Sequence, residues 1–100
     1  MLKKKFFKSK PTCQVTFQLP EGIEATKVSV AGDFNNWDES ANPLKKAKGV
    51  WKTTLELELG QAYQFRYLVN GREWHNDEAA DKYVPNNIDG DNSVVTTYPN

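Results

Sequence analysis

Two tryptophans stand where an indole ring is hard to bury. Trp37 falls within GDFNNWD, and asparagine and aspartate favour turns because their short side chains bond the local backbone. Trp74 lies three residues past the Asn70-Gly71 pair, and Arg66 lies on the polar face of the preceding strand. Two aromatic rings near a basic donor suit a ligand with flat, stackable faces. Sugars qualify, because their C–H groups form an apolar face and their hydroxyls need donors and acceptors around it.

The same two tryptophans have a plainer explanation. Both lie at predicted strand ends, so they could instead close the two ends of a hydrophobic core. Trp51 differs from them, because it shares the phase of Leu55, Leu57 and the other apolar residues of its strand. We therefore predict Trp51 in the core and leave both possibilities open for Trp37 and Trp74.

Catalysis has little support in this sequence. Glycoside hydrolysis needs two carboxylates about 5–10 Å apart around a cleft, whereas the acids fall mostly in residues 73–91 and on an outward face at Glu56 and Glu58. His75 is the only histidine, so no histidine-paired nucleophile arises. Cys13 is predicted to be a small buried hydrophobe rather than a nucleophile. We expect no enzyme activity and no catalytic residue.

A metal or a cofactor is not expected either. Asp89, Asp91 and Asn92 invite a calcium interpretation, but they lack the glycine and glutamate positions of an EF-hand loop. No phosphate-cradling glycine loop is present.

The elements that position these residues are predicted to be strands. Apolar residues alternate with polar ones in segment after segment, which is typical of half-buried antiparallel strands. Asn70-Gly71 is a strong hairpin signal, and the polar residues 76–92 are predicted to form a long loop. The prediction is all-β, an antiparallel β-sandwich of immunoglobulin-like proportions with about seven strands. The segments are 13–19, 28–30, 51–59, 63–69, 72–75 and 93–98, with a further possible strand over 3–8.

Length and charge bound the remaining possibilities. One hundred residues make one domain, and the formal net charge is zero. We expect residues 1–11 to form a basic N-terminal arm or first strand and residues 12–98 to form the module. Five lysines lie in residues 1–10 and six acids in residues 73–91, and both groups are expected on solvated surfaces. Acids flanking the aromatic residues would repel phosphates, so no nucleic-acid partner is expected.

The compartment follows from the cysteine count and from apolar runs. Cys13 is the only cysteine, which excludes an internal disulfide and favours a reducing compartment. The basic start lacks the apolar stretch of a signal peptide, and no run reaches membrane-spanning length. We expect a cytoplasmic protein with no membrane partner.

Three stretches together carry a family resemblance. VSVAGDFNNWDESANPLKK, GVWKTTLELELGQAYQFRYLVNGREWHND and DGDNSVV occur in order. They resemble carbohydrate-binding modules of family 48, which include the isoamylase N-terminal (early set) domain and the glycogen-binding domain of the AMP-activated protein kinase β subunit. The resemblance covers roughly residues 12–98. It implies an early-set immunoglobulin-like sandwich that binds α-1,4-glucan, as glycogen, starch or maltooligosaccharide.

The resemblance also implies particular site residues. Trp37 and Trp74 match the two stacking tryptophans, and Arg66 stands where the family commonly has lysine. Asn92 matches an asparagine that precedes the final strand and donates to sugar hydroxyls, and Ile88 is the nearest match to an apolar residue that leans on the glucan. A glycogen-metabolising enzyme or another protein is a possible partner. The alternative is a protein–protein docking module on the same sandwich that has lost glucan binding.

Overall fold

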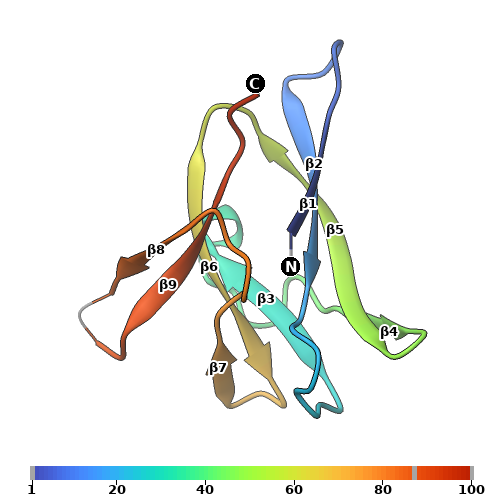
Figure 1. Cartoon of the computed structure of the whole chain (residues 1–100), viewed down its shortest axis with the longest axis vertical. Helices are drawn as coiled ribbons and strands as arrows, with labels where there is room; N and C mark the ends of the chain where they lie inside the picture. The colour runs from blue at the N-terminus through green and yellow to red at the C-terminus, as the bar shows by residue number, and fades with distance from the viewer. Residues whose placement is uncertain (1, 87, 100) are drawn as a thin grey trace.

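Two antiparallel β-sheets pack face to face in a computed structural model that describes residues 2–86 and 88–99 (Figure 1). The described residues form nine strands and one short 3₁₀ helix, η1. They are β1 (Leu2–Phe6), β2 (Thr12–Gln18), β3 (Val28–Gly32), η1 (Asp33–Asn35), β4 (Lys45–Ala47), β5 (Val50–Glu58), β6 (Ala62–Val69), β7 (Glu73–His75), β8 (Lys82–Pro85) and β9 (Asp91–Thr96). The predicted all-β, early-set immunoglobulin-like sandwich is confirmed.

Each sheet has a simple order. The first sheet runs β1-β2-β5-β4, and the second runs β3-β6-β9-β8, with β7 pairing with the end of β6. The β6–β7 hairpin turns at Asn70-Gly71, where both residues adopt positive φ, 56° and 74°, as the predicted turn requires. None of the described residues forms a helix long and apolar enough to cross a membrane.

Two short strands were not expected. The prediction of one long loop over residues 76–92 is wrong, because β8 pairs with β9 inside it. The second, β4, pairs with β5. Both strands lie at sheet edges and bury little, so their side chains show no apolar alternation. Asn92 was expected just before the last strand and instead lies within β9.

The core fills the space between the inner faces of the two sheets. On β2 the side chains alternate between buried and half-buried, and Cys13 and Phe17 are fully buried. Phe17 meets Phe65 of β6 edge to face, with ring centroids 5.0 Å apart. Burial raises the pKa of the Cys13 thiol, which keeps it protonated as a small apolar side chain. Trp51 is half-buried and packs against this core, as its phase predicted.

The basic N-terminal segment forms an edge strand. In the register of β1 with β2, Lys4 lies opposite Val15, whose side chain is fully buried. Lys4 therefore shares the inner face of the sheet, and its Nζ reaches Asp81, 2.6 Å away, in the chain before β8. A charge on the inner side of an edge strand discourages pairing with another chain. This ion pair also ties the first sheet to the second.

A buried polar network holds the chain after β7. Tyr67 of β6 donates to the Asp77 carboxylate at 2.7 Å, and the Asp77 amide donates to the Ser93 hydroxyl of β9 at 2.9 Å. Asp77 is 1% exposed, and burial together with the neighbouring Asp77 charge raises the pKa of Tyr67. The network anchors the end of the segment that carries Trp74.

Candidate functional site

A shallow hollow of about 240 Å³ lies on the outer face of the second sheet. It brings together all five residues that the sequence predicted for the site and adds two that it did not. The lining residues are Trp37, Arg66, Trp74, Asn86, Ile88, Asp89 and Asn92.

The strand register puts three of these side chains on one face. Trp74 of β7 lies opposite Leu68 of β6, and Arg66 is two residues from Leu68, so all three point the same way. Asn92 of β9 is two residues from Val94, which lies opposite Gln64 in the same phase. This face is opposite to the core. In the described part of the chain, neither Trp37 nor Trp74 packs against the core cluster, so the two tryptophans do not close the ends of the core.

Trp37 is held in place by its own backbone and by Asp33. It adopts a left-handed φ of 58°, a conformation that costs a non-glycine residue about 1–2 kcal/mol. Its amide donates to the Gly32 carbonyl at 2.9 Å, and its indole Nε1 donates to the Asp33 carboxylate at 3.1 Å. The other Asp33 carboxylate oxygen accepts a hydrogen bond from the backbone amide of Gln64 in β6 at 2.8 Å. Asp33 thus links the indole directly to the sheet.

Asn35 organises the turn that leads to Trp37. Its side-chain oxygen accepts from the Gly32 amide at 3.0 Å. Its side-chain nitrogen donates to the Val30 carbonyl at 3.1 Å and to the Asn42 side chain at 2.7 Å. The two asparagines of the GDFNNWD stretch therefore shape the turn, as predicted: Asn35 bonds the surrounding chain, and Asn36 adopts a left-handed φ of 57°.

The two indoles meet at an angle. The Trp37 and Trp74 ring centroids are 6.4 Å apart, and the ring planes are inclined by 64°, an edge-to-face arrangement. The pair is therefore not one flat surface. The Arg66 guanidinium carbon lies 5.8 Å from the Trp74 ring centroid, which adds a cation–π contact beneath the second indole.

Arg66 is fixed by a carboxylate partner. Its Nη1 donates to both oxygens of Asp89, at 2.9 and 3.1 Å, and its side chain is 13% exposed. These hydrogen bonds lower the pKa of Asp89, so the carboxylate stays ionised at neutral pH. The Arg66 Nε is buried and has no hydrogen-bond partner among the described residues. The guanidinium is held rigidly beside the hollow.

Asn86 orders the loop between β8 and β9. Its side-chain oxygen accepts from the amides of Ile88 and Asp89, each at 2.9 Å. Its nitrogen donates to Asp89 at 2.9 Å and to Asn92 at 3.0 Å. Asn92 in turn donates to the Gln64 side chain at 3.0 Å and is 7% exposed, and among the described residues nothing accepts from its second side-chain amide hydrogen. Ile88 is 91% exposed in the same loop.

Sequence reasoning missed Asn86 and the pairing of Asp89 with Arg66. The Asn-x-x-Asp spacing of Asn86 and Asp89 is a signal for a turn built on an asparagine side chain. It could have identified the hydrogen bonds that order the β8–β9 loop. Among the described residues, no group of three histidine, cysteine, aspartate or glutamate side chains could hold a metal ion.

The fold and the hollow define a class of protein. The β-sandwich gathers two aromatic rings, a guanidinium paired with a carboxylate and side-chain amide groups on one sheet face. The family model described as "Carbohydrate-binding module 48 (Isoamylase N-terminal domain)" matches residues 23–84, more than half of the chain. The chain belongs to carbohydrate-binding module family 48. The match includes Trp37, Arg66 and Trp74 and ends before Ile88 and Asn92.

Two curated relatives are similar over shorter stretches. A 1,4-alpha-glucan branching enzyme, GlgB, of Pseudomonas putida is 45% identical over 47 residues, which is 44% of this chain and 6% of the enzyme. GlgB of Synechocystis sp. is 37% identical over 60 residues, which is 59% of this chain and 8% of the enzyme. The similarity therefore reaches only a small part of each enzyme.

Proposed function

We propose that this protein binds α-1,4-glucan without catalysing its conversion, using the Trp37–Trp74 pair as the stacking surface. The observation that carries the proposal is the convergence of Trp37, Arg66, Trp74, Ile88 and Asn92 in one hollow of a family-48 sandwich. The names of the two relatives, 1,4-alpha-glucan branching enzymes, support this glucan as the ligand class.

The angle between the indoles suits a curved chain. An α-1,4 linkage turns each glucose ring relative to the one before, so successive rings present their apolar faces in different directions. Two indoles inclined by 64° can each stack on a different ring of such a chain. A β-1,4 chain is flat and extended, and it would match a coplanar pair better.

The polar groups around the indoles supply the hydroxyl contacts. Asn92 has one side-chain amide hydrogen with no acceptor in the described part of the chain, and Asp89 is half-exposed and ionised, so it can accept. Two stacked rings and a few such bonds must offset several kcal/mol of lost translational and rotational freedom. We expect a dissociation constant of about 10 μM to 1 mM for a short oligosaccharide, or roughly −4 to −7 kcal/mol.

The absence of catalysis is part of the proposal. Asp89 is the only carboxylate among the described residues that line the hollow, and its hydrogen bonds hold Arg66. Hydrolysis of a glycosidic bond uses a pair of carboxylates, one of which must change its protonation state. An ionised Asp89 bound to a guanidinium is a poor general acid, because its pKa is lowered rather than raised.

Tryptophan fluorescence during titration with maltoheptaose tests the proposal, with cellobiose as the control sugar. We expect a saturable change for maltoheptaose alone. Trp74→Ala should weaken binding by about tenfold or more, as expected for truncation of a central aromatic contact. Trp51→Phe alters an indole outside the hollow and should leave the affinity unchanged. Absence of any change in the wild type up to about 10 mM, where even a ~1 mM site should be mostly occupied, would reject glucan binding.

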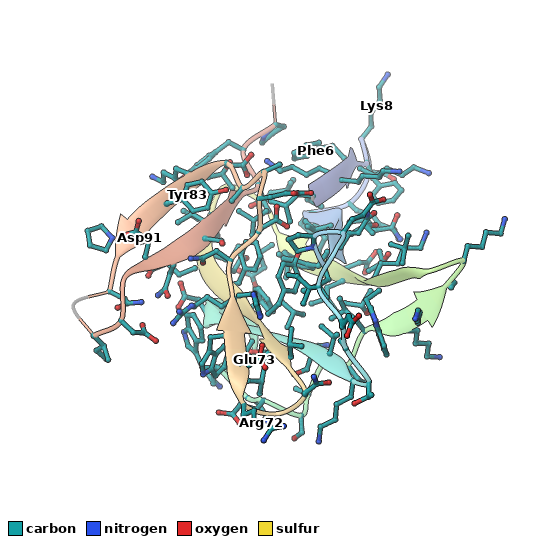
Figure 2. The ribbon with its side chains drawn as sticks, turned by 60° about the horizontal axis from the view of Figure 1, so that its bottom comes forward. Phe6, Lys8, Arg72, Glu73, Tyr83 and Asp91 are labelled. Atoms are coloured by element: carbon teal, nitrogen blue, oxygen red, sulfur yellow. The ribbon has the colours of Figure 1, made fainter. Side chains whose placement is uncertain are left out.

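Failure of glucan binding would favour the docking alternative. The partner search would then begin at β1, where Phe6 is 39% exposed among lysines. In Figure 2, Phe6 and Lys8 lie at the end of the molecule away from Arg72 and Glu73. Whether the protein binds glucan or docks a protein, a glycogen-metabolising enzyme is the first partner to test.

A further inference from the structure

A second hollow opens on the same outer face of the second sheet. Its volume is about 390 Å³, larger than that of the first hollow. Leu68 of β6 and Ser29 of β3 lie opposite each other in register on this face. The lining residues are Lys27, Val28, Ser29, Glu39, Ser40, Pro43, Leu68 and Gly71.

The second hollow adjoins the tryptophan pair. On β6, Leu68 lies between Ser29, which lines the second hollow, and Trp74, which lines the first. Glu39 follows Trp37 by two residues. Trp74 therefore lies opposite a lining residue of the second hollow, and Trp37 is close to another along the chain. In Figure 2 the β6–β7 turn, marked by Arg72 and Glu73, lies at the bottom, well away from Tyr83 and Asp91 of the β8–β9 region.

The rim of the second hollow carries a base, Lys27, and an acid, Glu39. Neither Lys27 nor Glu39 makes an ion pair with another residue in the described part of the chain. The end of the Lys27 side chain lies over Gly71, where an added Cβ would come within 3.4 Å of the Nζ. The Ser29 hydroxyl donates to the backbone carbonyl of Glu39 at 2.8 Å and so holds the Glu39 backbone in place.

This combination suits a sugar better than it suits an apolar or a strongly charged ligand. The exposed Pro43 and the edge of Leu68 provide an apolar lining, while the ammonium and the carboxylate can donate to and accept from neighbouring hydroxyls. Because Lys27 is positive and Glu39 is negative, a strongly anionic or strongly cationic ligand would be repelled by one of the two.

We infer that the second hollow extends the glucan site, and that a chain stacked on Trp37 and Trp74 continues across Leu68 to place further glucose units between Lys27 and Glu39. The inference rests on the proposed function and adds a requirement for chain length. The first hollow alone, at about 240 Å³, is smaller than the roughly 300–1,000 Å³ of typical small-molecule sites, and the two together fall within that range.

The test compares maltotriose with maltoheptaose by titration calorimetry. We expect the wild type to bind the longer sugar more tightly. Lys27→Ala and Glu39→Gln should each weaken maltoheptaose binding by about three- to tenfold, the effect of losing a hydrogen bond to a charged group at a partly exposed site. Both should leave maltotriose binding within about twofold of wild type, because that sugar is held at the indole pair. Lys52→Ala and Glu56→Gln, exposed residues of β5 in the other sheet, are matched controls and should change neither affinity.

An NMR titration of the wild type gives an independent outcome. The Gly71 amide should shift with maltoheptaose and not with maltotriose, whereas the Trp74 indole should shift with both. Binding of both sugars with no shift at Gly71, or with no effect of Lys27→Ala and Glu39→Gln, would overturn the extension and leave the proposed function intact. Binding of neither sugar would reject the proposed function and the extension with it.

Discussion

Gly32 is the position where a single methyl group should disturb both the fold and the site. Its φ of −174° is ordinary extended backbone, so alanine would meet no conformational strain there. A Cβ would however lie 2.4 Å from the carbonyl oxygen of Gln64 and 2.8 Å from the Cβ of Phe65. Both atoms belong to the central part of β6 and cannot move aside like the end of a flexible side chain. Gly32→Ala must therefore push β3 away from β6.

The size of the effect follows from that displacement. A clash of this depth requires a shift of about 1 Å to restore van der Waals contact, and overpacking of a well-packed interior typically costs about 1–3 kcal/mol. We expect the upper end, about 3 kcal/mol, because the clashing atoms belong to β6, which is an inner strand of the sheet. For a domain of this length the melting temperature should fall by about 12–24 °C. A typical stability of about 5–15 kcal/mol leaves the variant folded at room temperature.

Urea unfolding followed by circular dichroism measures this loss. Gly22→Ala is the matched control, because Gly22 has no atom within 4 Å of an added Cβ but has a φ of +88°. That variant should lose only about 1–2 kcal/mol, the cost of a left-handed conformation. Gly32→Ala should also weaken maltoheptaose binding, because the Gly32 carbonyl accepts the Trp37 amide. A Gly32→Ala protein as stable as the wild type would refute the close approach of β3 to β6.

Three further predictions concern single side chains. Tyr67→Phe should destabilise the fold by about 1–3 kcal/mol, because it removes a hydrogen bond from the buried Asp77 carboxylate; an unchanged urea midpoint would contradict this. Burial alone would raise the pKa of Asp81, but hydrogen bonds from Lys4 and from Thr96 of β9 lower it overall. Its stabilising effect is therefore present above the unfolded pKa and is lost as pH falls through the folded pKa. The wild type should therefore lose more stability than Asp81→Asn between about pH 5 and pH 2.5, measured as the change in urea midpoint, and equal losses would rule out the Lys4 ion pair. Arg66→Lys should weaken maltoheptaose binding several-fold in calorimetry, because an ammonium cannot reproduce the planar contacts of a guanidinium; binding at least as tight as wild type would show that the planar group has no role.

Sequence patterns predicted the fold well where strands bury one face. The alternation in β2 and β6 identified their inward residues, and Asn70-Gly71 located the β6–β7 hairpin, because each pattern reflects a local physical requirement. The same logic failed for β8. Its side chains are mostly exposed at a sheet edge, so nothing in their apolar spacing distinguishes them from a loop.

Five of the seven residues that line the hollow were predicted from the sequence, but their geometry was not. Trp37 and Trp74 could be named from their positions at turns, whereas the angle between their rings depends on the left-handed backbone at Trp37 and on the register of β7 with β6. The bond between Arg66 and Asp89 joins residues 23 positions apart. It depends on how Asn86 folds the loop after β8, which no periodic pattern records.

The central claim is that Trp37 and Trp74 contact glucan while Trp51 does not. The three indole N–H groups give separate signals in a proton–nitrogen NMR spectrum, so one titration with maltoheptaose follows all three at once. The account predicts saturable shifts of the Trp37 and Trp74 signals at one shared dissociation constant and no shift of Trp51, which packs against the core. A shift confined to Trp51, or no shift of any indole at about 10 mM sugar, would contradict it.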